Sequence, residues 1–128
     1  MHDSPCRTIL VVEDERAVGK VVKLFLESAG FEVHIASSGT AALRAVMAQQ
    51  PALVILDVGL PDIHGYDVAR LIRKTHPQVP LIMLTGMSRP IEQLRGFAYG
   101  ADAYLTKPFQ PLELLETVSL LLGQTTLS

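Results

Sequence analysis

Short runs of β-branched and aliphatic residues alternate along this chain with longer stretches whose apolar residues recur at helical spacing. Strands of this type are predicted at Thr8–Val12, Glu32–Ala36, Leu53–Leu56, Leu81–Leu84 and, from a weaker signal, Ala103–Leu105. When strands and helices alternate, the connections favour parallel strands joined by right-handed crossovers. The alternation therefore predicts an α/β fold built on one parallel sheet.

The five intervening stretches are predicted to be helices. In the first, the apolar residues from Val18 to Ala29 follow the i, i+3, i+4, i+7 pattern, and Gly30 stands where the helix would end. The others are predicted at Thr40–Gln49 after an N-cap at Ser38, at about Tyr66–Lys74, from near Pro90 to near Gly100, and at Pro111–Leu122. The runs LVIL and LIML show no polar alternation, as expected when helices cover both faces of the sheet.

Length and charge narrow the class of protein. A chain of 128 residues fits a single domain, with a predicted core of about residues 7–123 and a short tail at 124–128. The net charge of −2 gives the chain no overall basic character for binding nucleic acid, and no apolar run approaches the roughly 20 residues of a membrane span. The start lacks the pattern of a signal peptide, and Cys6 is the single cysteine. We therefore expect a cytoplasmic protein that binds neither nucleic acid nor membrane.

Polar residues follow the predicted strands at their carboxyl ends, where open α/β sheets bind their ligands. The residues are Glu13, Asp14 and Glu15 after the first strand, Asp57 after the third, Thr85 after the fourth, and Thr106 and Lys107 after the fifth. Because the strands are predicted to be parallel, these side chains should gather at one edge of the sheet.

Such a set of side chains suits phosphoryl transfer. Clustered carboxylates repel one another and favour a hard cation such as Mg²⁺, which binds oxygen ligands and phosphate oxygens. Lys107 and Thr85 can hold the remaining oxygens of the transferred group, since this reaction depends mostly on positioning and charge neutralisation. Asp57, at the end of a central strand, is the best candidate for a carboxylate nucleophile that forms an aspartyl phosphate.

The blocks VVEDE, LDVGLPDIHGYD, LTG and YLTKPF resemble the signature blocks of response-regulator receiver domains of two-component signal transduction. The resemblance covers about residues 7–123, with the blocks in the family order. It implies a flavodoxin-like (βα)5 fold, in which five helices flank a five-stranded parallel sheet of order 2-1-3-4-5. It also implies a signalling phosphoprotein that catalyses only its own phosphorylation and dephosphorylation, not an enzyme acting on other substrates.

The resemblance implies a role for each site residue. Asp57 would accept a phosphoryl group from a histidine kinase or histidine phosphotransfer protein, and Mg²⁺ (or Mn²⁺) would be held by Asp57, by Asp14 directly, by Glu13 through water and by the Gly59 carbonyl. Lys107, which would precede a cis peptide bond to Pro108, and Thr85 would bind the phosphoryl oxygens. Tyr104 would change rotamer with Thr85 and alter the face formed by the fourth helix, the fifth strand and the fifth helix, where an output domain or partner protein would bind.

Simpler interpretations exist for each residue taken alone. Glu13, Asp14 and Glu15 could cap a helix, Asp57 could begin a turn, Thr85 could be a cap, Lys107 could be a solvated charge, and Tyr104 could be a packing residue. Their joint occurrence at four strand ends favours a site.

Rival classes of protein fit the residues less well. A phosphatase of the haloacid-dehalogenase type needs a second aspartate where this chain has Gly59, and Glu13 and Asp14 would repel the phosphate of a flavin mononucleotide. A receiver-like binding module that works without phosphate would keep the fold but lose the acid, threonine and lysine residues of the site. A Mg²⁺ titration would distinguish such a module from a phosphoacceptor. The resemblance also implies that the side chains two residues after the aspartate and two residues after the threonine can orient or block a hydrolytic water. These positions are Gly59 and Met87, and neither can hydrogen-bond a water through a side chain, which predicts a long-lived phosphorylated state.

Overall fold

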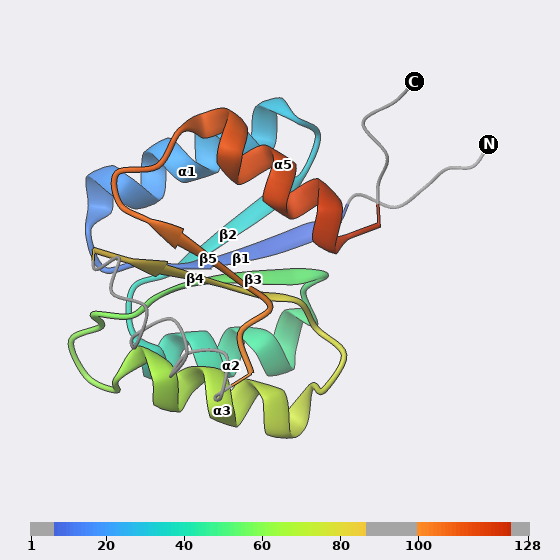
Figure 1. The fold of residues 1–128 in the computed structure, drawn as a ribbon. Helices are drawn as coiled ribbons and strands as arrows, with labels where there is room; N and C mark the ends of the chain where they lie inside the picture. Colours follow the sequence, from blue (N-terminus) through green and yellow to red (C-terminus); the bar gives the residue numbers. More distant parts are fainter. Residues whose placement is uncertain (1–6, 87–99, 124–128) are drawn as a thin grey trace.

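In the computed structural model of the chain, which describes residues 7–86 and 100–123, helices lie on both faces of one parallel sheet (Figure 1). The five strands are paired in the order β2-β1-β3-β4-β5, as the resemblance implied. Their bounds are β1 Thr8–Val12, β2 Glu32–Ala36, β3 Leu53–Asp57, β4 Leu81–Thr85 and β5 Ala103–Thr106. The described helices are α1 Arg16–Ser28, α2 Gly39–Gln49, α3 Gly65–Thr75 and α5 Pro111–Leu121.

The buried residues of the strands alternate between two different cores. On one face, α1 and α5 pack on side chains such as Val11 of β1 and Ile55 of β3, and on the other face α2 and α3 pack on side chains such as Leu10 and Val54. Every residue of β3 and β4 is buried. Burial on both faces explains why these two strands show no polar alternation in the sequence.

The ends of the helices agree with local sequence signals. Ser38 is the N-cap of α2, and its Oγ accepts a hydrogen bond from Ala41 N at 3.1 Å. The chain leaves α1 through Gly30, whose φ of +99° is readily adopted only by glycine. Pro111 occupies the first turn of α5, where its missing N–H costs no hydrogen bond.

The structure refines several predicted boundaries. β3, β4 and β5 each extend one residue further than predicted, so that Asp57, Thr85 and Thr106 are the last residues of their strands. The predicted helix from near Pro90 to near Gly100 falls on residues 87–99, outside the described residues, as does Met87. Within residues 7–86 and 100–123, no helix is both long enough and apolar enough to cross a membrane.

Candidate functional site

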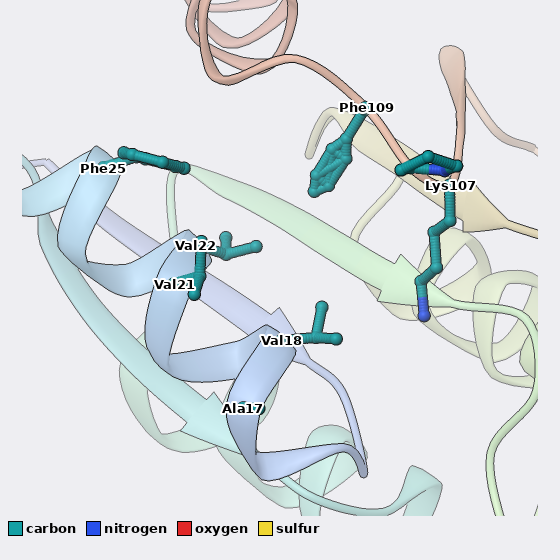
Figure 2. Close-up of a pocket in the computed structure, with 8 residues that line it drawn as sticks. Ala17, Val18, Val21, Val22, Phe25, Lys107 and Phe109 are labelled. Atoms are coloured by element: carbon teal, nitrogen blue, oxygen red, sulfur yellow. The ribbon is translucent and has the colours of Figure 1, made fainter.

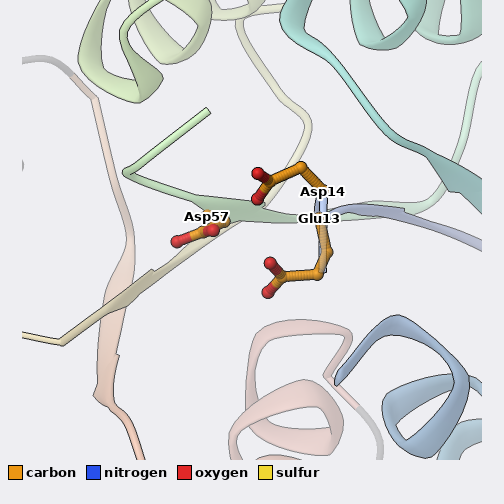
Figure 3. Close-up of side chains that lie close together, drawn as sticks. All are labelled: Glu13, Asp14 and Asp57. Carbon is orange, nitrogen blue, oxygen red and sulfur yellow. The ribbon is translucent and has the colours of Figure 1, made fainter. Parts of the chain in front are cut away.

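Strand register brings three carboxylates together at the carboxyl edge of the sheet. Val12 of β1 pairs with Leu56 of β3, so the next residues, Glu13 and Asp57, lie side by side. One carboxylate oxygen from each of Glu13, Asp14 and Asp57 lies within 4.8 Å of the others. Figure 3 shows the three side chains converging from the ends of the two strands. Glu13 and Asp57 are buried, whereas Asp14 is exposed.

Lys107, which follows β5, brings a positive charge to these acids. Its Nζ lies 3.0 Å from Glu13 Oε1, 3.5 Å from Asp57 Oδ1 and 3.7 Å from Glu15 Oε1. We call Glu13, Asp14, Asp57 and Lys107 the carboxyl-edge cluster. The peptide bond from Lys107 to Pro108 is cis, which confirms the expectation drawn from the resemblance.

Burial and crowding set the charge states in the carboxyl-edge cluster. Burial raises the pKa of the Glu13 carboxyl to about 7, and the nearby Asp57 adds to the effect, although the hydrogen bond from Lys107 acts in the opposite direction. Burial alone would lower the pKa of Lys107, but its hydrogen bond to Glu13 and the charge of Asp57 outweigh this and raise it. At neutral pH, Lys107 is therefore charged and Glu13 is close to its titration midpoint.

Other predicted site residues lie at the same edge. Thr85 is buried at the end of β4, and its carbonyl accepts a hydrogen bond from Lys107 N at 2.7 Å. The backbone N–H of Gly59 donates to Asp57 Oδ1 at 3.3 Å, so the loop after β3 turns back over the aspartate. Tyr104 is half-buried in β5, and its hydroxyl donates to the Tyr66 hydroxyl of α3 at 3.3 Å.

The capping interpretation of the acidic triplet does not account for its arrangement. Glu15 is the N-cap residue of α1, but within the described residues its side chain accepts no capping hydrogen bond from that helix. Glu13 Oε2 accepts from Glu15 N at 3.2 Å, while Glu13 Oε1 binds Lys107. The Glu13 carboxylate therefore bridges the start of α1 and the end of β5, in the interior of the edge.

The donor chemistry of the carboxyl-edge cluster fits Mg²⁺. Three carboxylates meet at one point, all three offer the hard oxygen atoms that this ion prefers, and the exposed Asp14 leaves the point open to water. Three negative charges against one lysine would leave an excess of −2 if every group were ionised, and a divalent cation would neutralise that excess. The geometry therefore suits a cation that also binds phosphate oxygens.

Sequence reasoning missed two side chains close to this edge. Asp62, in the loop between β3 and α3, binds the first turn of α2. Tyr66 is 4% exposed and receives the Tyr104 hydrogen bond, and its ring lies 5.1 Å from that of His64, between ring centroids. The sequence does signal that Asp62 lies in a loop, within the motif LPD, and that Tyr66 lies near the start of a helix. Neither signal reveals which residue the side chain contacts.

Comparisons with known proteins identify the family. The family model described as "Response regulator receiver domain" matches residues 9–119. The transcriptional regulatory protein SrrA of Staphylococcus aureus is 40% identical over 117 residues, which are 91% of this chain and 48% of SrrA. The chain belongs to the response regulator receiver domain family of two-component systems. It spans about half the length of the curated relatives it matches.

Solved structures agree with this assignment. A putative response regulator from Chloroflexus aurantiacus is 36% identical, with a TM-score of 0.89, and the match covers 93% of this chain and 99% of that one. A CheY-like receiver domain protein from Methanospirillum hungatei is 32% identical, with a TM-score of 0.88, and the match covers 92% and 94% of the two chains.

Proposed function

We propose that the chain is a single receiver domain whose Asp57 accepts a phosphoryl group from a histidine kinase or a histidine phosphotransfer protein in a Mg²⁺-dependent reaction. The observation that carries this proposal is the meeting of Glu13, Asp14 and Asp57 within 4.8 Å, with Lys107 beside them. Receiver domains are signalling proteins, and we expect this chain to act as a phosphoacceptor in the cytoplasm.

In the proposed reaction, an Asp57 carboxylate oxygen attacks the phosphorus of a phosphohistidine. An O–P bond forms, the P–N bond breaks, and the histidine nitrogen leaves with the electron pair and later takes a proton from water. Lys107, 3.5 Å from Asp57, would pair with a phosphoryl oxygen, and the Thr85 hydroxyl would donate to another.

The proposed metal ligands are Asp14, Asp57 and the Gly59 carbonyl, with Glu13 acting through a water molecule. Bound Mg²⁺ would neutralise charge on the phosphoryl oxygens and orient the group for in-line transfer. The chain's own contribution is to hold Asp57 against the Gly59 N–H on one side and the Lys107 ammonium on the other.

An apolar groove beside Lys107 suits the docking of the phosphodonor. It measures about 450 Å³ and lies between α1 and the segment that follows β5 (Figure 2). It is lined by Ala17, Val18, Val21, Val22, Phe25, Lys107, Pro108 and Phe109. Because Lys107 borders both the groove and Asp57, a helix seated there would bring its histidine to the phosphoacceptor. We propose that the occupant is the histidine-bearing helix of the donor.

If the donor helix docks in this groove, a charge placed in the groove should slow phosphoryl transfer from a kinase but not from acetyl phosphate. Val21 lines it with 47% of its surface exposed, whereas the exposed Leu24 of the same helix does not line it. Val21→Glu should slow transfer from a histidine kinase that phosphorylates the wild type, while phosphorylation by acetyl phosphate stays unchanged. Leu24→Glu, the matched control, should change neither rate. Equal slowing of the kinase reaction by both variants would argue against docking in the groove.

The signal is proposed to leave through the face formed by β5, α5 and the predicted helix within residues 87–99. Leu112 and Leu120 of α5 are 65% and 77% exposed, which suits contact with an output domain or partner protein. If Thr85 moves toward the phosphoryl group, Tyr104 can turn inward, which shifts the population between two packings. Thr85→Ala should therefore still be phosphorylated but should show weakened NMR shifts at β5 and α5.

Phosphorylation of Asp57 is tested directly with acetyl phosphate and Mg²⁺. The wild type should gain acid-labile phosphate, seen as a mobility shift in a phosphate-affinity gel, and both Asp57→Asn and excess EDTA should abolish the shift. Asp67→Asn is the matched control, because Asp67 is an exposed acid on α3. Phosphate uptake by Asp57→Asn at the wild-type rate would disprove the assignment. A wild type that neither binds Mg²⁺ nor gains phosphate would instead favour a phosphate-independent binding module.

A further inference from the structure

The carboxylate of Asp62 caps a helix that is distant from it in sequence. Its Oδ1 accepts a hydrogen bond from Gly39 N at 2.8 Å, and its Oδ2 accepts from Thr40 N at 3.0 Å and from Thr40 Oγ1 at 2.7 Å. Ser38 Oγ accepts from Ala41 N, so the first three N–H groups of α2 all have partners. One of the two capping side chains thus comes from the β3–α3 loop, residues 58–64.

The β3–α3 loop approaches α2 closely at this cap. A Cβ atom on Gly39 would lie 2.9 Å from Val68 Cγ2 and 3.0 Å from Ile63 Cβ, so glycine is what allows the contact. The end of the loop is equally constrained, because Gly65 N donates to Val58 O at 3.0 Å and a Cβ on Gly65 would lie 2.6 Å from Val58 Cα. The path of the loop is therefore held at Asp62 and at its junction with α3.

The same loop carries Gly59, the proposed backbone ligand of Mg²⁺. Gly59 lies two residues after Asp57 and three before Asp62, and its N–H already donates to Asp57 Oδ1. The Thr40 hydroxyl and the N–H groups of Gly39 and Thr40 hold the pKa of Asp62 well below its usual range, so this carboxylate stays ionised at neutral pH. The loop is thus held on both sides of the position where its carbonyl is needed.

We infer that Asp62 is a positioning residue for the metal site: by binding the N-terminus of α2, it holds the β3–α3 loop where the Gly59 carbonyl can ligate Mg²⁺ beside Asp57. This inference rests on the proposed function. A loop that is already ordered loses less conformational entropy when the ion binds, which strengthens binding. By reciprocity, bound Mg²⁺ strengthens the contact between Asp62 and α2.

The test compares removal of the two caps of α2. Mg²⁺ affinity is measured by amide NMR titration of the full chain in the wild type, Asp62→Ala and Ser38→Ala, at a temperature where all three are folded by circular dichroism. Asp62→Ala should weaken Mg²⁺ binding at least fivefold, and Ser38→Ala should leave it within twofold, because Ser38 caps the same helix without holding the loop. Asp62→Asn, which keeps an acceptor oxygen, should recover part of the loss.

A second readout follows from reciprocity. Saturating Mg²⁺ should slow hydrogen exchange of the Gly39 and Thr40 amides in the wild type, and this protection should disappear in Asp62→Ala. Equal Mg²⁺ affinity in wild type and Asp62→Ala, or equal losses in Asp62→Ala and Ser38→Ala, would overturn the inference while leaving phosphorylation of Asp57 intact. A wild type that binds no Mg²⁺ would overturn both the inference and the proposed metal site.

Discussion

Two charged clusters lie at opposite edges of the sheet and differ in how their charges are matched. At the amino ends of β4 and β5, the Arg73 guanidinium of α3 meets the Asp102 carboxylate at 2.9 Å. Arg73 also donates to the carbonyls of Pro77, Val79 and Gly100, each at 2.7 Å, and Asp102 Oδ2 accepts from Leu81 N at 2.8 Å. We call Arg73, Asp102 and these backbone groups the Arg73 cluster.

The Arg73 cluster has one cation, one anion and several backbone partners, so its charges balance and both terminal nitrogens of the guanidinium are hydrogen-bonded. The carboxyl-edge cluster instead places Glu13, Asp14 and Asp57 around Lys107, and burial raises the pKa of Glu13 to about 7. A balanced, hydrogen-bonded cluster stabilises the fold, whereas crowded like charges cost stability until a ligand neutralises them. The comparison suggests that one edge of the sheet is optimised for stability and the other for binding.

The largest expected effect is on stability at the Arg73 cluster. Arg73→Ala should lower the free energy of unfolding by about 3 kcal/mol, because several carbonyls and a carboxylate lose charge-assisted partners. Urea unfolding measures this loss. The stability of Arg73→Lys, the charge-preserving control, should lie between those of the wild type and Arg73→Ala, because an ammonium cannot reproduce the forked hydrogen bonding of the guanidinium. Mg²⁺ affinity should stay within twofold in both variants, and a loss below 1 kcal/mol in Arg73→Ala would contradict a structural role.

The next effect is stabilisation of the carboxyl-edge cluster by metal. At a Mg²⁺ concentration of about 100 times the dissociation constant, the free energy of unfolding of the wild type should rise by about 2.7 kcal/mol. Asp14→Asn should remove most of this gain, and it should raise the metal-free stability slightly because it removes one of the three crowded charges. The measurement is urea unfolding with and without Mg²⁺ at constant ionic strength. An equal gain in wild type and Asp14→Asn would show that the ion binds elsewhere.

Burial of Glu13, together with the nearby Asp57, predicts a pH dependence of the stability of the metal-free protein. Because the folded pKa is raised from 4.5 to about 7, the folded state binds more protons than the unfolded state between these values. The stability contributed by Glu13 is therefore fully present below pH 4.5 and is lost as the pH rises through about 7. The pKa of Lys107 is raised above 10.5, so its own titration lies outside this window.

Urea unfolding in EDTA between pH 4.5 and 8 measures the Glu13 contribution. Glu13→Gln, which cannot ionise, should show a flatter profile than the wild type over this range. Parallel profiles in the two proteins would mean that other groups cause the pH dependence.

The smallest expected effect concerns the tyrosine pair next to the carboxyl-edge cluster. Tyr66→Phe removes the hydroxyl that accepts from Tyr104 at 3.3 Å, and it should cost about 0.5 to 1 kcal/mol of stability. It should also make Tyr104 easier to rearrange, so the NMR shifts of β5 amides should reach their phosphorylated positions more completely with acetyl phosphate. Unchanged stability together with unchanged shifts would show that the pair does not restrain Tyr104.

Much of the fold was predictable because its signals are local. The runs Leu53–Leu56 and Leu81–Leu84 are continuously apolar because both faces of these strands are covered, and Ser38 and Gly30 mark helix ends by their own chemistry. The position of Asp57 at the end of a central strand follows from the same runs. Acids, a threonine and a lysine at the ends of parallel strands must share one edge, so a candidate site could be predicted without coordinates.

Local sequence patterns therefore place the strands to within one residue at their ends and predict which residue types gather there, whereas the pairing of individual side chains depends on the tertiary structure. Lys107 pairs with Glu13 across 94 positions, Tyr104 with Tyr66 across 38, and Asp62 with Gly39 across 23. These pairings depend on the register of β1, β3 and β5 and on the path of the β3–α3 loop. No local sequence pattern encodes these long-range pairings, because they are set by how the two layers of helices pack on the sheet.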